Sequence, residues 1–197
     1  LMRVSFTGEL GFEINVPPDA ARSVWEALWA AGQAYDVVAY GTESMHVMRA
    51  EKGYIIVGQD TDGTVTPDDA GMSWAVGKAK KDFVGKRSLA RPDLVAAGRK
   101  QFVGLMTDDP RLVPMEGAQI VARADYVIGE HAVGHVTSAY ESPALDRSIA
   151  LAVIENGRAL MGRKVFIASV IGSKRVAIPA TVCDPVFVDK KGERLDG

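Results

Sequence analysis

Several features are scarce or missing in this sequence, and each absence narrows what the chain can be. Its 197 residues include a single cysteine, Cys183, which excludes an internal disulfide and any zinc site built from several cysteines. No apolar run reaches the roughly 18 residues that a membrane-spanning helix needs, and no secretory signal opens the chain. These absences suit a reducing compartment, so we expect a cytoplasmic protein that does not bind a membrane.

Neither sign of charge dominates the composition. A formal net charge of −2 argues against a protein whose whole surface binds nucleic acid. A local basic patch is still compatible with this balance, because Lys78, Lys80, Lys81 and Lys86 lie close together in the sequence. The common interpretation of such a stretch is a solvated basic loop, and the alternative is an anchor for a polyanionic tail.

Candidate metal ligands and nucleophiles are few as well. His131 and His135 lie four residues apart in a predicted strand, which places them on one face but roughly 13 Å apart, too far to share one ion. His46 is distant in sequence and is expected to be a packed or surface histidine. No phosphate-binding glycine loop and no Ser-His-Asp or Cys-His constellation is present, and Cys183 lies in a β-type run typical of a core. The sequence therefore predicts no metal site.

The first half of the chain mixes strand and helix patterns. Arg3–Phe6 and Gly11–Val16 are predicted to be short strands around a turn at Gly8. A helix is predicted after Pro17-Pro18-Asp19 and is expected to end at Gly32. Its apolar residues recur at helical spacing: Val24, Leu28 and Ala31 on one side, with Trp25 and Trp29 alongside.

Further helices are expected downstream. One is predicted from Thr42, a plausible N-cap, to Lys52, with Met45, Val47 and Met48 in its buried stripe. Another helix is predicted to begin at Thr66-Pro67-Asp68-Asp69. Lys86–Leu94 is predicted to be a short helix, and Ala96–Lys100 a linker.

After Gln101 the character of the sequence changes. Short β-type runs recur between turn residues, which is typical of a small all-β barrel or sandwich. We therefore expect an α+β fold with one domain over residues 1–98 and a β domain over residues 99–197. The predicted strands are Phe102–Met106, Gln119–Ala122, Ala132–Thr137, Ile149–Ile154, Lys164–Ile167 and Val176–Val182.

Two motifs have a simple structural interpretation, and the first of them also has a functional one. Phe6–Glu13 is most simply a β-hairpin with turn glycines. In the functional alternative, Glu13 lies in a cleft and accepts two hydrogen bonds from an amino-pyrimidinone edge, while Phe6 stacks on the flat ring. Met48–Gly53 is most simply a solvated helix end with cations near the C-terminus.

Five stretches, taken together and in order, resemble the glycine-cleavage T-protein (aminomethyltransferase) superfamily. Each is weak alone, but their order and gaps are specific, and they cover essentially the whole chain. The stretches are Ser5–Glu13 (SFTGELGFE), Met48–Gly53 (MRAEKG), Thr66–Gly71 (TPDDAG), Asp82–Lys86 (DFVGK) and Gly134–Ala152 (GHVTSAYESPALDRSIALA). Within the superfamily, Gly41–Gly53 and the tail Asp184–Gly197 most resemble the alpha subunits of heterotetrameric sarcosine oxidases.

The resemblance implies a partial aminomethyltransferase-like folate-binding core followed by a small C-terminal all-β barrel. The pteridine-binding glutamate of the family falls on Glu13, and the aromatic residue of its YTGE-type motif falls on Phe6, which lacks the usual hydroxyl. An arginine that contacts the substrate carboxylate falls on Met45. The catalytic aspartate of the family lies upstream, so we expect no catalytic residue in this chain. Lys78, Lys80 and Lys81 become candidate contacts for a polyglutamate tail.

The same resemblance implies a function within a larger protein. We expect the tetrahydrofolate-binding part of a sarcosine oxidase alpha subunit, which captures the one-carbon unit from sarcosine as 5,10-methylenetetrahydrofolate. Because the chain opens directly on a strand pattern, we expect a fragment that is inactive alone. Flavin and NAD are expected only in missing parts or in partner subunits. Two alternatives stay open: an aminomethyltransferase of the glycine cleavage system, against which Met45 argues, and a folate-binding module without catalysis.

Overall fold

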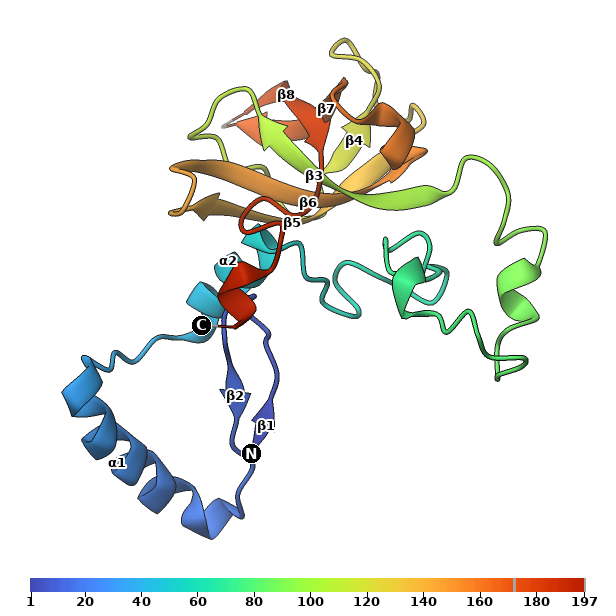
Figure 1. Ribbon diagram of the computed structural model, residues 1–197. Helices are drawn as coiled ribbons and strands as arrows, with labels where there is room; N and C mark the ends of the chain where they lie inside the picture. The colour runs from blue at the N-terminus through green and yellow to red at the C-terminus, as the bar shows by residue number, and fades with distance from the viewer. Residues whose placement is uncertain (172, 197) are drawn as a thin grey trace.

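The two halves of the chain are built differently. The computed structural model describes residues 1–171 and 173–196. Its second half closes into a β-barrel, whereas its first half forms an open arm of a hairpin, two helices and a long loop, residues 52–99 (Figure 1). From the barrel, the C-terminal tail returns to the second helix and the hairpin, so the two ends of the chain lie on the same side of the barrel.

The barrel consists of six antiparallel strands in the order β3-β6-β5-β4-β7-β8. It closes where β3 pairs with β8, with Gly104 opposite Cys183. Closure gives each strand a paired neighbour on both sides over part of its length, which reduces the exposed sheet edge available for edge-to-edge association. The strands are β3 (Lys100–Thr107), β4 (Gln119–Val121), β5 (Gly134–Ser142), β6 (Arg147–Glu155), β7 (Lys164–Ile171) and β8 (Lys174–Cys183).

Strand β6 is apolar on both faces because it lies between two packed layers. Over Ile149–Ile154, the even-numbered side chains join the barrel core. The odd-numbered ones form a second cluster with Phe102 and with Ala50 of helix α2. A strand with two buried faces reads as a continuous apolar run, and this strand therefore joins the barrel to the arm.

All six predicted strands of the second half are confirmed, and most of them extend beyond the predicted bounds. The fold class of a partial α+β core followed by a small all-β barrel is confirmed too. Two predicted strands include residues that are not in the observed strand: β4 ends at Val121 rather than Ala122, and β5 begins at Gly134 rather than Ala132. Of the two histidines expected in a strand, only His135 lies in one. A Cβ atom at Gly134 would lie 2.1 Å from the Val153 carbonyl oxygen, which explains the glycine at this close approach.

The arm begins with a short hairpin and a helix. Strands β1 (Met2–Arg3) and β2 (Phe12–Glu13) pair over two residues each, so both are shorter than predicted. Helix α1 (Ala21–Gly32) follows the two prolines and ends at Gly32, as predicted. None of its residues is buried. Single-turn 3-10 helices lie at Pro18–Ala20, Gln33–Tyr35, Ser73–Ala75, Ser88–Ala90, Gly157–Leu160 and Glu193–Leu195.

Helix α2 (Thr42–Glu51) lies directly beneath the barrel (Figure 1). Its N-cap is Gly41 rather than Thr42, and no side chain caps it. The predicted stripe of Met45, Val47 and Met48 is only half-buried. The fully packed part is the last turn, where the helix meets β5 and β6.

Two predicted helices are absent from the described residues. At Thr66 the chain makes one turn and stops, because Gly71 adopts a left-handed φ of +72°. The start of a helix is present, because the Asp69 carboxylate accepts bonds from the amide and hydroxyl of Thr66 while the Asp69 amide donates to the Thr66 hydroxyl, a reciprocal capping pair. Over Lys86–Leu94 only Ser88–Ala90 is helical, as a single 3-10 turn.

Candidate ligand-binding cleft

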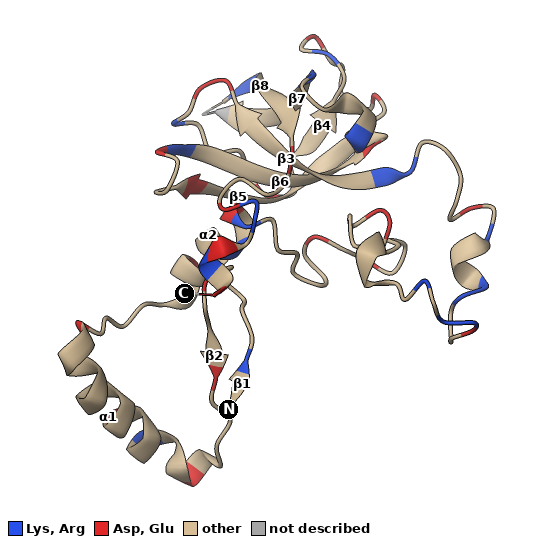
Figure 2. Cartoon of the chain, viewed as in Figure 1, with Lys and Arg blue, Asp and Glu red and all other residues tan. Residues whose placement is uncertain are grey.

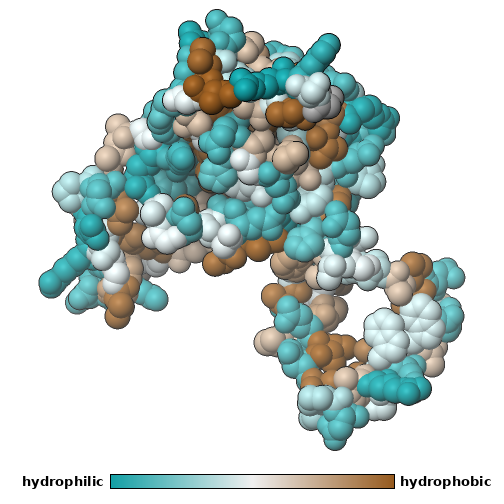
Figure 3. Space-filling view, turned by 180° about the vertical axis from the view of Figure 1, so that it is seen from behind, coloured by the Kyte–Doolittle hydropathy of each residue, from teal (hydrophilic) through white to brown (hydrophobic). Residues whose placement is uncertain are grey.

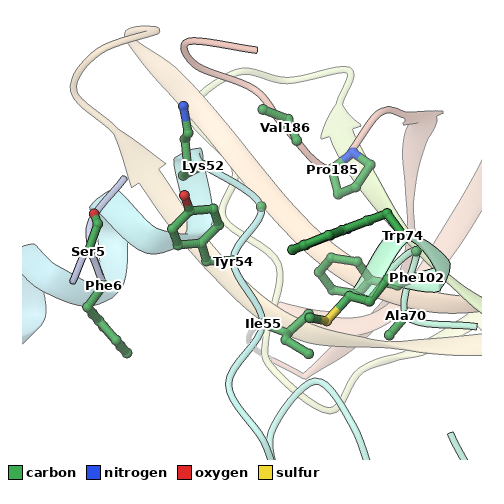
Figure 4. Close-up of a pocket in the computed structure, with 13 residues that line it drawn as sticks. Ser5, Phe6, Lys52, Tyr54, Ile55, Ala70, Trp74, Phe102, Pro185 and Val186 are labelled. Atoms are coloured by element: carbon green, nitrogen blue, oxygen red, sulfur yellow. The ribbon is translucent and has the colours of Figure 1, made fainter. Parts of the chain in front are cut away.

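A cleft of about 500 Å³ lies where the hairpin turn, the end of α2, the long loop and the barrel meet. Its volume falls within the range of roughly 300–1,000 Å³ that is usual for small-molecule sites. Ser5 and Phe6 lie at one end of the cleft, and Trp74 and Phe102 at the other (Figure 4). The lining residues are Ser5, Phe6, Lys52, Gly53, Tyr54, Ile55, Ala70, Gly71, Met72, Trp74, Phe102, Pro185 and Val186.

The chemistry of this lining suits a flat, mostly apolar molecule. Four aromatic side chains face the cleft, and Trp74 is 79% exposed. Aromatic faces of this kind favour stacking or edge-on contacts with another ring. Lys52 contributes a cation at the rim, but its ammonium group is already held by Asp189. The cleft therefore favours contacts with a ring over contacts with polar groups.

Phe6 is one of the two residues that the sequence proposed as ligand contacts, and it lines the cleft. Its ring meets that of His46 edge-on, with centroids 6.2 Å apart and planes at 86°. His46 is thus a packed histidine on α2, and its Nδ1 atom is buried with no hydrogen-bond partner among residues 1–171 and 173–196. The rest of the Phe6 ring stays open to the cleft, with the residue 40% exposed.

Glu13 is the other proposed contact, and it lies outside the cleft lining. It is exposed in β2, where it pairs with Met2. Strand β2 lies farther from the barrel than the hairpin turn does (Figure 1). Phe6 is four residues beyond Met2, so the two proposed contacts are spread along the hairpin. The role of Glu13 stays a prediction.

The three lysines proposed as tail contacts are all exposed on the long loop. Figure 2 shows them within a run of blue segments on the outer side of the arm. Lys80 borders a hollow with Phe83 and Leu89, and Lys78 borders a neighbouring one, whereas neither lines the main cleft. The role of Lys78, Lys80 and Lys81 also stays a prediction.

Arg49 overturns the interpretation of Met48–Gly53 as a solvated helix end. Its side chain is completely buried. One guanidinium nitrogen donates to Asp60 at 2.6 Å and to the Tyr54 carbonyl at 3.1 Å, and the other donates to Ser138 at 2.6 Å. The ring of Tyr140 lies 5.9 Å from the guanidinium carbon. Burial of a guanidinium is tolerated when its charge is paired and most of its donors are bonded; here both terminal nitrogens are bonded, whereas Nε has no partner among the described residues.

Asp60 completes this buried network from the loop. Its carboxylate is fully buried and also accepts bonds from the Ile56 amide at 2.8 Å and the Thr137 and Ser138 hydroxyls. Thr137 and Ser138 both reach it because β5 has a bulge between Val136 and Ser138, and a bulge re-aims side chains locally. The network fixes α2, the loop and the barrel against one another directly beside the cleft.

Glu51 and Lys52 continue the packed end of α2. The Glu51 carboxylate accepts hydrogen bonds from the Ser142 hydroxyl and the Ala144 amide of the barrel. The Lys52 ammonium donates to both the carboxylate and the carbonyl oxygen of Asp189. The bond from Lys52 holds the pKa of Asp189 below its ordinary value.

Sequence reasoning missed most of the cleft lining and the whole buried network. Trp74 and Phe102 belong to different predicted domains, so nothing in the linear pattern joins them. For Arg49 there was a signal: it lies one turn from Met45 and shares that side of the helix with a predicted apolar stripe. Charged residues at such positions are buried only with partners, and the partner here is distant in sequence.

Metal and thiol chemistry find no support in the described parts of the chain. Over residues 1–171 and 173–196, no three His, Cys, Asp or Glu side chains are placed to hold a metal ion. Cys183 is half-buried at the end of β8, less enclosed than predicted. Burial, with the nearby Asp184 carboxylate, raises the pKa of its thiol to about 11, so it is protonated at neutral pH. No helix in the described part is long and apolar enough to cross a membrane.

Comparison with known proteins agrees with this architecture. Residues 1–80 match the family model of the GCVT N-terminal domain, and residues 100–189 match that of the glycine cleavage T-protein C-terminal barrel domain. A solved structure of the glycine cleavage system aminomethyltransferase T from Bartonella henselae superposes with a TM-score of 0.77 at 27% identity, covering 94% of this chain and 48% of that one.

Two curated relatives show how much of a longer protein the match spans. The sarcosine oxidase subunit alpha of Corynebacterium sp. (strain U-96) is 51% identical over 200 residues, which cover 100% of this chain and 20% of the relative. An aminomethyltransferase of Halothermothrix orenii is 34% identical, over 85% of this chain and 44% of the relative. The chain thus spans a fifth of the first relative and less than half of the second. Both halves of the chain match one family, and it belongs to the glycine-cleavage T-protein superfamily.

Proposed function

We propose that this chain is the tetrahydrofolate-binding part of a sarcosine oxidase alpha subunit. In this proposal it captures the one-carbon unit released from sarcosine as 5,10-methylenetetrahydrofolate. The observation that carries the proposal is the aromatic-lined cleft between the hairpin and the barrel. The identity of 51% to a sarcosine oxidase subunit alpha over the whole chain, against 34% to an aminomethyltransferase, supports this branch of the superfamily.

The residues present fit a folate in its extended form. A pterin over the hairpin would meet Phe6 with its face and Glu13 with its amino-pyrimidinone edge, because Glu13 lies farther out along the same hairpin. The aromatic middle part of folate would then enter the cleft toward Trp74 and Phe102. The glutamate tail would leave toward the loop that carries Lys78, Lys80 and Lys81. In this arrangement residues 1–98 supply the hairpin and loop and residues 99–197 the barrel wall.

The chemistry in this proposal belongs to the ligand, and the chain positions it. Two nitrogens of tetrahydrofolate take up the one-carbon unit when it is bound. The chain holds the ring and limits its contact with water. The two folate nitrogens are then already in position when they meet the one-carbon unit. We assign no catalytic residue to this chain, and flavin and NAD to other parts or subunits of the enzyme. We therefore expect that the chain alone neither oxidises sarcosine nor forms the folate product.

An aminomethyltransferase of the glycine cleavage system is the alternative. Aminomethyltransferases are among the relatives, at 34% identity for the one described above. The resemblance places an arginine of that enzyme, which contacts the substrate carboxylate, at Met45. A methionine cannot form that ion pair, so the alternative is the weaker of the two. A folate-binding module without catalysis would share the same cleft.

A pair of phenylalanines in one hairpin tests where the ligand binds. Phe6 lines the cleft, whereas Phe12 is 56% exposed in β2 and does not. In the complete protein, Phe6→Ala should weaken tetrahydrofolate binding about tenfold, equivalent to about 1.4 kcal/mol, through loss of the ring contact. Phe12→Ala should leave the dissociation constant within about twofold. Equal effects of the two variants in a calorimetric titration would remove Phe6 from the site.

A further inference from the structure

The C-terminal tail runs back over the end of α2 and the hairpin turn. After β8 ends at Cys183, the amides of Phe187 and Val188 both donate to the Glu51 carbonyl, each at 2.9 Å. In Figure 1 the tail's single helical turn lies beside α2, with the C-terminus near the hairpin. The family model of the barrel ends at residue 189. The contacts made by residues 190–196 therefore lie beyond the part that the family model describes.

Asp189 is the residue that organises this tail. Its carboxylate pairs with Lys52 at 2.6 Å, and the two side chains are only 8% and 9% exposed. The same carboxylate accepts bonds from the Glu193 and Arg194 amides, at 3.0 and 3.2 Å, and so closes the last helical turn. Its backbone adopts a left-handed φ of 48°, which costs energy in a residue other than glycine. The ion pair and the two caps hold that conformation.

The closed tail in turn holds the hairpin. The Leu10 amide donates to the Arg194 carbonyl at 2.9 Å, and the Arg194 guanidinium pairs with Glu9 at 3.0 Å. Arg3 donates to the Leu195 carbonyl at 2.8 Å and pairs with Asp196 at 3.0 Å. The tail thus contacts both sides of the hairpin turn. Figure 2 shows blue and red segments of the tail beside α2, and a further blue segment on β1.

Lys52 lies between the tail and the hairpin turn and contacts both. A Cβ atom at Gly8 would lie 2.5 Å from Cγ of Lys52, so the turn rests directly on the lysine stem. Gly8 also has a φ of +82°, which favours glycine on conformational grounds. Asp189 fixes the ammonium end of that stem. The position of the turn, and of Phe6 just before it, therefore depends on a residue of the tail.

Within the described part of the chain, the hairpin makes few other contacts besides that of Phe6 with His46. Its two strands pair over only two residues each, and short hairpins are marginally stable by themselves. We propose that residues 189–196 form a strap that positions the hairpin turn, and with it Phe6, at the cleft, and that Asp189 is its central positioning residue. The consequence for the ligand rests on the proposed function. The strap itself does not.

Asp189→Asn in the complete protein tests the strap. Asparagine tolerates the left-handed backbone but removes the charge that holds Lys52. Asp108→Asn is the matched control, because Asp108 also pairs with a lysine, Lys164, but on the barrel. The readouts are amide hydrogen exchange of residues 5–10, exchange of the barrel strands, and the dissociation constant of tetrahydrofolate.

The strap predicts faster exchange at residues 5–10, about tenfold or more, with the barrel strands unchanged and with folate affinity reduced about fivefold or more. Asp108→Asn should change neither the exchange at residues 5–10 nor the affinity for folate. Unchanged exchange at residues 5–10 would overturn the strap. Faster exchange with unchanged affinity would overturn the positioning role of Asp189. Absence of folate binding in the unmodified protein would refute the proposed function, and exchange alone would then decide the strap. If Asp189→Asn does not fold, Arg194→Ala, at a half-exposed side chain, is subject to the same criteria.

Discussion

Arg49 and Asp60 show how single residues join the two halves of the chain. Both side chains are 0% exposed and lie 2.6 Å apart, and they link the last turn of α2 to the loop and the barrel. The energy of such a pair is asymmetric. Forming it recovers little beyond the desolvation cost, whereas removing one partner leaves an unpaired buried charge. The pair therefore serves chiefly to fix one arrangement of α2, loop and barrel.

Asp60→Ala should lower the free energy of unfolding by about 3–5 kcal/mol, because it leaves the Arg49 guanidinium buried without its counter-ion. The matched control is Glu141→Ala, since Glu141 pairs with Arg111 at 3.0 Å but is 60% exposed. Exposed pairs of this kind contribute about 0–1 kcal/mol. Urea denaturation measures both variants. A similar small loss in the two would contradict the structural role of the buried pair.

Residues such as these mark the limit of prediction from sequence. Phe6 could be singled out because its motif is local, and it does line the cleft. Arg49 could not be placed, because its partners Asp60 and Ser138 are 11 and 89 residues away. Without those partners the simplest expectation for an arginine at a helix end is a solvated cation. Burial of charge depends on tertiary partners that no local pattern displays.

The strands of the barrel could be predicted because their sequence signals are local. Their alternating or continuous apolar runs between turn residues specify strands locally, and all six were found. The helix predicted to begin at Thr66 ends after one turn. Its N-cap signal is genuine, but Gly71 adopts a left-handed φ, so the helix does not continue. The long loop as a whole is held by its ends and by single contacts such as the Arg99–Asp69 pair.

The basic part of that loop carries a prediction of its own. In the complete protein, a variant with Lys78, Lys80 and Lys81 all changed to Gln should bind polyglutamyl folate more weakly and the monoglutamate almost unchanged. Exposed charge pairs contribute about 0–1 kcal/mol each and are screened by salt, so the loss should be several-fold and should shrink in high salt. Lys174→Gln, at an exposed lysine of β8, is the control. Equal losses for both ligands would mean a general structural effect, and no loss would leave only a solvated loop.

Across the whole molecule, burial is uneven. The barrel encloses a continuous apolar core, whereas the arm exposes large apolar side chains on the hairpin and on α1. Trp25 and Trp29 stack on each other with centroids 6.0 Å apart but remain 59% and 39% exposed. Figure 3 shows hydrophobic side chains around the space between the hairpin and α1. The proposal that this chain works within a larger enzyme accounts for that exposure, since large apolar patches usually mark contact surfaces.

The central claim is that this molecule binds reduced folate along the hairpin and cleft, and Glu13 tests it most directly. Glu13→Gln removes one charge from the hairpin and changes little else, because Glu13 is exposed. Glu43→Gln, at an exposed carboxylate on α2, is the control. Calorimetric titration of tetrahydrofolate into the complete protein should show an affinity about ten- to a hundredfold weaker for Glu13→Gln, because a hydrogen bond to a charged group contributes about 1.5–3 kcal/mol. The control should match the unmodified protein. Unchanged affinity for Glu13→Gln would contradict the account.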